Sequence, residues 1–166
     1  DTIAVAYNAD ALTAAGIDPA IFDEWTWNPD NGGTFAETVA RLTIDENGNN
    51  GLSADFDGTK VKQYGLANKI GDAYGQAGWS LFAASTGWRF LDAPWTPPYH
   101  LDDPRLAASI QNLADMSLTK KISAPEENVT SLGAEAMFSA GTAALVFFGS
   151  WMINWLSENV TFPFAF

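Results

Sequence analysis

One apolar run near the C-terminus constrains the fold more than any other stretch. Residues 143–156, AALVFFGSWMINWL, are apolar up to a break at Gly149 and Ser150, after which Trp151 and Trp155 follow at helical spacing. The first half is typical of a buried strand, and the second half is expected to open a helix with Ser150 as its N-cap. Such a turn would present free backbone N–H groups beside an indole. It is therefore a candidate ligand site, with core packing of both tryptophans as the alternative.

Length and charge narrow the range of partners. The chain has 166 residues and a net charge of −12, so we expect one domain, 1–166, with a proper core and no attraction to nucleic acid or anionic lipid. Its longest apolar run is shorter than the roughly 20 residues of a membrane span, so no direct membrane insertion is expected. The chain contains no cysteine, which excludes disulfides and thiol sites. Seven tryptophans favour flat apolar faces for a ligand.

The order of apolar patterns predicts an α/β domain. Period-two or continuous apolar stretches predict strands at 3–7, 63–67 and 143–149. Helical spacing predicts helices at 10–15, 34–42, 74–85 and 131–140, and one that begins at Pro104 after Asp103. Thr34 and Glu37 have the spacing of a capping box. The expected fold class is a helix-rich single lobe with a small mixed sheet.

Four segments carry a resemblance to a known family. They are YNADAL at 7–12, TFAE at 34–37, LF at 81–82 before GW at 87–88, and FSAG at 138–141 leading to GSW at 149–151. In this order they resemble the family 1 extracellular solute-binding proteins, the maltose-binding-protein-like sugar receptors of ABC importers. The resemblance runs through nearly the whole chain. It implies the C-terminal lobe of a two-lobed protein with a periplasmic-binding-protein-like type II fold, which holds a sugar in the cleft between its lobes.

The resemblance also implies partners and a location. The partners would be an oligosaccharide, the missing first lobe of the same protein and the permease subunits of an ABC importer, with no cofactor. The location would be extracellular or periplasmic, with a lipid anchor in the full-length protein. Both ends of the chain have the appearance of cuts from a larger protein, which agrees with an isolated lobe.

The strongest residue match is the turn at the end of the apolar run. Trp151 matches the family's cleft tryptophan, which lies against a sugar ring, and an aromatic face stacks well on the C–H face of a pyranose. Backbone N–H groups at Gly149 and Ser150 are expected to bind sugar hydroxyls. Trp155, one turn deeper, is expected to pack in the core.

Weaker matches extend the candidate site. Trp79 occupies the position of a second cleft aromatic, and Tyr74 and Gln76 lie one turn earlier, where polar cleft contacts occur; the alternative puts Trp79 in the core and Tyr74 on the surface. Tyr7 and Asn8 would lie beside the hinge, where Asn8 has a second interpretation as a helix cap. The chain departs from the family at 24–33, where an insertion would either shape specificity or decorate the surface.

Two other classes of protein remain as alternatives. A glycoside hydrolase needs two carboxylates about 5 to 10 Å apart, and acidic pairs occur at 55 and 57, 102 and 103, and 126 and 127, where turns and helix caps also explain them. His100, the only histidine, lacks a nucleophile motif. Acidic and amide residues at 45, 47 and 49 are similar to a calcium loop without its distal Glu. We therefore assign no catalytic and no metal residue. The third class is a non-binding interaction domain.

Overall fold

The protein is built on one five-stranded sheet. The computed structural model describes residues 2–69, 75 and 78–166, so Tyr74 and Gln76 lie outside the described residues. The strand order is β2-β3-β4-β1-β5, with β1 (Ile3–Asn8), β2 (Ile44–Asp45), β3 (Val61–Ala67), β4 (Ala143–Gly149) and β5 (Phe164–Ala165). The predicted mixed sheet is confirmed, since β4 pairs in parallel with β3 and antiparallel with β1. The continuous apolar run therefore forms the central strand.

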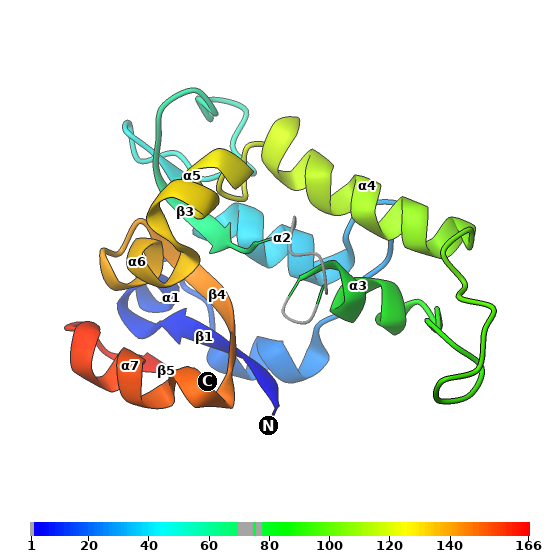
Figure 1. Ribbon diagram of the computed structural model, residues 1–166. Coiled ribbons are helices and arrows are strands. Elements are labelled where there is room, and N and C mark those ends of the chain that lie inside the picture. The colour runs from blue at the N-terminus through cyan, green and yellow to red at the C-terminus, as the bar shows by residue number, and fades with distance from the viewer. Residues whose placement is uncertain (1, 70–74, 76–77) are drawn as a thin grey trace.

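Helices cover both faces of this sheet (Figure 1). On one face lie α2 (Gly33–Leu42), α3 (Trp79–Ser85) and α4 (Pro104–Leu118), and on the other lie α6 (Ala134–Ser139) and α7 (Ile153–Asn159). Successive side chains of a strand point to opposite faces, so Leu145 joins the first core and Val146 the second. Shorter elements complete the chain, namely α1 (Ala9–Ala14), α5 (Glu126–Leu132) and the 3₁₀ helices η1 (Pro19–Glu24) and η2 (Ser150–Met152).

Three details of the predicted helices are wrong. The helix expected at 74–85 begins at Trp79, because the described residues Gly75 and Gly78 before it are not helical. The helix expected at 131–140 is divided by Gly133, whose φ of 91° ends α5 before α6 begins. The expected capping box at Thr34 is also absent, because α2 starts one residue earlier and the Thr34 hydroxyl accepts the N–H of Thr26 instead. The start of α4 is confirmed, with Asp103 as N-cap and Pro104 in the first turn.

A buried threonine joins α2 to β3. The Thr43 hydroxyl accepts the N–H of Gly65 at 2.8 Å and lies 2.8 Å from the carbonyl oxygen of Ile122, to which it can donate. Gly65 lies so close to the end of α2 that a β-carbon there would overlap the Val39 carbonyl. The strand and the helix can approach this closely only because residue 65 has no side chain.

Candidate functional site

Of the two tryptophans that follow β4, one is exposed and the other packs against the core. Trp151 lies in η2 and is 52% exposed. Trp155, on α7, packs against the second core, which contains Phe138 and Leu156. The core interpretation of Trp155 is confirmed, and the indole of Trp151 keeps about half of its surface for another molecule.

Gly149 determines where the Trp151 indole lies. A β-carbon at position 149 would overlap three carbons of the six-membered ring, so the indole folds back over the glycine. The backbone of Gly149 is extended, with φ −79° and ψ 153°, a conformation that any residue adopts. The glycine is therefore needed for the space it leaves to the indole and not for its backbone freedom.

The expectation of free backbone N–H groups at this turn is wrong for Ser150. Its N–H donates to the carbonyl of Thr2 at 2.9 Å, and its hydroxyl accepts the Thr2 N–H at 3.4 Å. The expected N-cap role of Ser150 is also wrong, because the N-cap of η2 is Gly149 and Ser150 is its first residue. The backbone N–H of Ser150, which was expected to bind sugar hydroxyls, is thus bonded to Thr2 at the start of β1. Ser150 holds the turn in place.

Trp79 is half-buried at the start of α3. Its indole lies against Gly75 and packs edge-on against Trp88, with ring centroids 5.8 Å apart. Phe82, one turn further along α3, lies 5.4 Å from Phe147, which precedes Gly149 by two residues. The start of α3 and the end of β4 therefore belong to the same region of the molecule.

Tyr7 and Asn8 lie at the other end of β1. Tyr7 pairs with Leu145, whereas Ile3 pairs with Gly149. Four strand residues separate these positions by about 13 Å. Asn8 caps α1, since its side-chain oxygen accepts the N–H groups of Asp10 and Ala11. The structure does not bring these two residues to the turn at Trp151.

The segment at 24–33, which was expected to be an insertion, packs two tryptophans against the core. Trp25 packs edge-on against Phe35 at 5.0 Å and donates its indole N–H to the Thr38 hydroxyl at 3.1 Å. Trp27 packs 4.8 Å from Phe82. Surface decoration is therefore the wrong interpretation of this insertion. No single sequence signal reveals this, because a segment rich in Pro, Asn and Gly has no apolar period.

Asp45 organises its loop with hydrogen bonds. The buried carboxylate accepts the backbone N–H groups of Asn47, Asn49 and Asp57 and the side-chain amide of Asn49. These bonds, the one from Asp57 most strongly, lower the pKa of Asp45 below its usual value of 3.8. Its oxygens are already used, and among the described residues no cluster of three or more acidic or histidine side chains has metal-binding geometry.

Asp103 and His100, the only histidine, also have local partners. The side-chain hydrogen bonds from Arg105 lower the pKa of Asp103 to about 2, and the same carboxylate caps α4. His100 lies 3.2 Å from the Asp92 carboxylate. These contacts explain both groups without a catalytic role.

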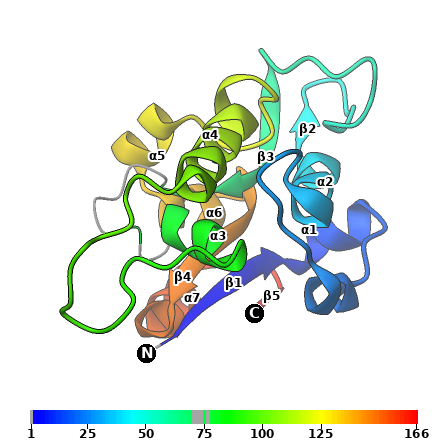
Figure 2. The same ribbon diagram turned by 90° about the vertical axis from the view of Figure 1, so that its right-hand side faces the viewer.

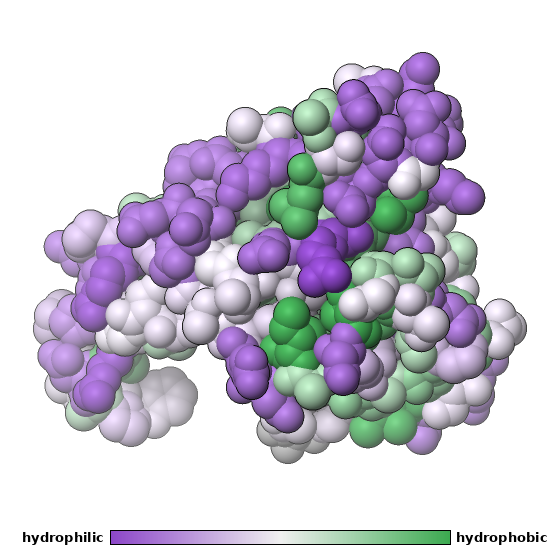
Figure 3. Space-filling view, turned by 180° about the vertical axis from the view of Figure 1, so that it is seen from behind, coloured by the Kyte–Doolittle hydropathy of each residue, from purple (hydrophilic) through white to green (hydrophobic). Residues whose placement is uncertain are grey.

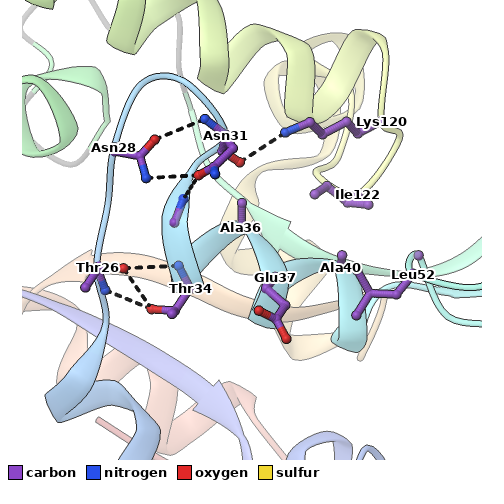
Figure 4. Close-up of a pocket in the computed structure, with 12 residues that line it drawn as sticks. Thr26, Asn28, Asn31, Thr34, Ala36, Glu37, Ala40, Leu52, Lys120 and Ile122 are labelled. Carbon is purple, nitrogen blue, oxygen red and sulfur yellow. Dashed lines mark hydrogen bonds between the residues drawn. The ribbon is translucent and has the colours of Figure 1, made fainter.

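A pocket of about 670 Å³ lies beside the start of α2, and none of the predicted site residues that the structure describes lines it (Figure 4). Its polar lining is largely bonded within itself, since Asn28 donates to Asn31 and Thr26 pairs with Thr34. Lys120 reaches the carbonyl of Asn31 at 3.3 Å. The polar groups of this wall therefore serve mainly to hold a turn together, and the wall offers little for a ligand to bind.

Comparison with known proteins identifies the architecture. No family model and no curated protein matches the sequence. Among solved structures, UspC of M. tuberculosis matches with a TM-score of 0.83 and 28% identity, over 98% of this chain and 40% of that chain. The ABC substrate-binding protein Lmo0181 from Listeria monocytogenes, in complex with cycloalternan, matches with a TM-score of 0.67 and 16% identity, over 98% and 35% of the two chains.

A third structure gives the same result. The maltose/maltodextrin-binding domain MalE from Bdellovibrio bacteriovorus, bound to maltotriose, matches with a TM-score of 0.65 and 20% identity, over 98% of this chain and 35% of that chain. The resemblance predicted from the sequence is thereby confirmed, because the chain has the fold of part of a solute-binding protein of ABC transporters. The chain spans about two fifths or less of each of these proteins. Within the described residues, every helix is too short or too polar to cross a membrane.

Proposed function

We propose that this chain is the second lobe of a carbohydrate-binding solute receptor that delivers its ligand to an ABC importer. The observation that carries the proposal is the half-exposed indole of Trp151, held over Gly149 at the end of the central strand. An indole with one face packed and the other open suits the C–H face of a sugar ring. Two structural neighbours are bound to the oligosaccharides cycloalternan and maltotriose, which supports the same class of ligand.

The site would combine an aromatic wall with polar groups from elsewhere. Trp151 would stack on one ring, and Trp79, at the start of α3 in the same region, would contribute a second apolar surface. Tyr74 and Gln76, which precede Trp79 in the sequence, are the proposed polar contacts. The remaining hydroxyls would be bound by the first lobe, since this chain spans 40% of UspC. Closure of the two lobes on the sugar would then signal to the permease.

The receptor would act outside the cytoplasmic membrane, in the periplasm or at the cell surface, and a lipid anchor would lie in the first lobe. It would bind its ligand without chemistry, as the neighbours with bound sugars are named binding proteins. A hydrolase would instead need a free pair of carboxylates. In each acidic pair found in the sequence, one carboxylate accepts a local hydrogen bond: Asp57 from Thr59, Asp103 from Arg105 and Glu126 from Thr130.

A titration of the full-length protein tests the proposal. Tryptophan fluorescence would be followed as linear oligosaccharides of glucose, galactose, mannose and xylose are added, for the wild type, Trp151→Ala and Trp151→Phe. We expect saturable binding of at least one sugar, a loss of about tenfold or more in Trp151→Ala, and a smaller loss in Trp151→Phe, which keeps an aromatic face. Absence of binding by every sugar, or undiminished binding by Trp151→Ala, would refute it.

A further inference from the structure

The segment between α3 and α4, residues 88–103, forms an arm that carries exposed aromatic rings. Trp95 at its tip is 93% exposed, Tyr99 is 54% exposed and Phe90 is 45% exposed. Figures 1 and 2 show the arm as a long loop that leaves the helices and extends toward the end of the molecule where the N-terminus lies. In Figure 3 it stands apart from the body, with a hollow in the surface between the two. The Trp95 ring at the tip of the arm contributes nothing to the core.

Trp95 adopts a backbone conformation that tryptophan rarely takes. Its φ is 62°, in the left-handed region, and it follows Pro94 in a turn closed by the bridge between Ala93 and Thr96. Glycine or asparagine is the usual residue at such a position, because a side chain there crowds the backbone. A large ring that is fully exposed gains no packing in return for this strain. The arrangement is understandable if the indole contacts another molecule.

The base of the arm is held firmly. The buried Trp88 donates its indole N–H to the His100 carbonyl at 2.8 Å, and the N–H of His100 donates to the Phe90 carbonyl at 3.1 Å. Arg105 on α4 donates to the carbonyl of Gly87 at 3.1 Å. An arm with a fixed base presents its rings with less loss of freedom on binding.

A continuous series of rings joins the arm to the proposed sugar site. Trp79 packs on Trp88 at 5.8 Å, Trp88 on Phe90 at 6.0 Å, and Phe90 on Tyr99 at 5.0 Å. The rings at the base of the arm are therefore packed, through the buried Trp88, onto Trp79 at the start of α3. Polar residues such as Asp92 and Thr96 lie between the exposed rings of the arm in the sequence.

We propose that this arm is an outer carbohydrate-binding wall, in which Trp95 stacks on the distal rings of an oligosaccharide whose inner ring lies at Trp151. The inference rests on the proposed function and makes it more specific. The ligand class would be a chain of several sugar units, since a monosaccharide at Trp151 gains nothing from the arm. The affinity of the receptor should therefore rise with chain length, and the arm should provide that rise.

The substitution Trp95→Gly removes the ring without harming the fold. Glycine accepts a φ of 62° without strain, and the exposed indole has no packing to lose, so the melting temperature should stay the same or rise. The control is Leu132→Ala, which truncates an exposed apolar side chain on α5. It should leave both the fold and the affinity unchanged.

Calorimetric titration of the full-length protein with linear gluco-, galacto-, manno- and xylo-oligosaccharides of two to six units tests the inference. In the series that the wild type binds, we expect Trp95→Gly to lose about tenfold in affinity for the longest sugars and less than about twofold for the disaccharide. An equal loss at every length would mean that Trp95 contacts the other lobe, and would overturn the inference. Unchanged affinity at every length would overturn it also, while the proposed function would stand. No binding of any sugar by the wild type would refute the proposed function and this inference together.

Discussion

The substitution Gly149→Ala should move the Trp151 indole without unfolding the protein. The extended backbone at position 149 accepts alanine, but the new β-carbon would occupy the space of three ring carbons. The indole is half-exposed, so it can swing into solvent instead of forcing the strand apart. A Gly→Ala change at a compatible position stabilises a protein by about 0.4–1 kcal/mol. This gain offsets part of the lost indole contacts, and the free energy of unfolding should change by less than about 1 kcal/mol.

The effect on ligand binding should be much larger. A buried tryptophan covers roughly 200 Å². With the Trp151 indole 52% exposed, roughly 100 Å² is left for a ligand to cover. At about 25 cal/mol per Å², this contact is worth about 2.5 kcal/mol, or roughly 60-fold in affinity. Because a displaced indole keeps none or only part of the contact, Gly149→Ala should weaken sugar binding by about 10- to 60-fold.

A double-mutant cycle separates this effect from general damage. Sugar affinity would be measured by calorimetry for Gly149→Ala, Trp151→Ala and the double variant, with melting temperatures alongside. If the indole carries the effect, Gly149→Ala should change nothing further once Trp151 is alanine. An equal loss of affinity in both backgrounds would refute the reasoning, because the glycine would then act on the ligand independently of the indole.

Three further predictions concern the scaffold. Thr43→Val removes a hydroxyl that accepts the N–H of Gly65, and should cost about 2 kcal/mol, seen as a fall of about 4–8 °C in melting temperature; an unchanged value would contradict the role of Thr43. Trp25→Phe leaves the Thr38 hydroxyl without its indole donor and should cost about 1 kcal/mol in urea unfolding, whereas no loss would mean that this bond is not stabilising. Because the pKa of Asp45 is lowered on folding, its contribution to stability is present above pH 3.8 and is lost as the pH falls through the folded pKa. Asp45→Asn should therefore reduce the stability difference between pH 6 and pH 3, and an unaltered difference would refute this.

Residue pattern was sufficient to predict the central elements. The strand at 143–149 is apolar without interruption because β4 is covered on both faces. The start at Asp103 and Pro104 is confirmed because capping is decided by neighbouring residues in the chain. Such local signals do not depend on where the rest of the protein lies.

The parts that sequence did not predict depend on distant partners. The N–H of Ser150 is taken by Thr2, which lies 148 positions away in the chain. The Asp45 carboxylate accepts the backbone N–H of Asp57, across a loop with no apolar period. Trp25 is half-buried because it packs against Phe35 of α2, and only the fold shows that these rings meet. For the same reason, pairing in the sheet separates Tyr7 from the turn at Trp151.

The most direct test of the central claim is a structure of the full-length protein with a bound oligosaccharide. The proposal predicts that the C–H face of one sugar ring lies on the open face of the Trp151 indole, within about 4 Å of its atoms. It also predicts that Gly149 lies against the opposite face, as it does here. A sugar bound elsewhere, with Trp151 facing solvent or packed into the other lobe, would contradict the claim.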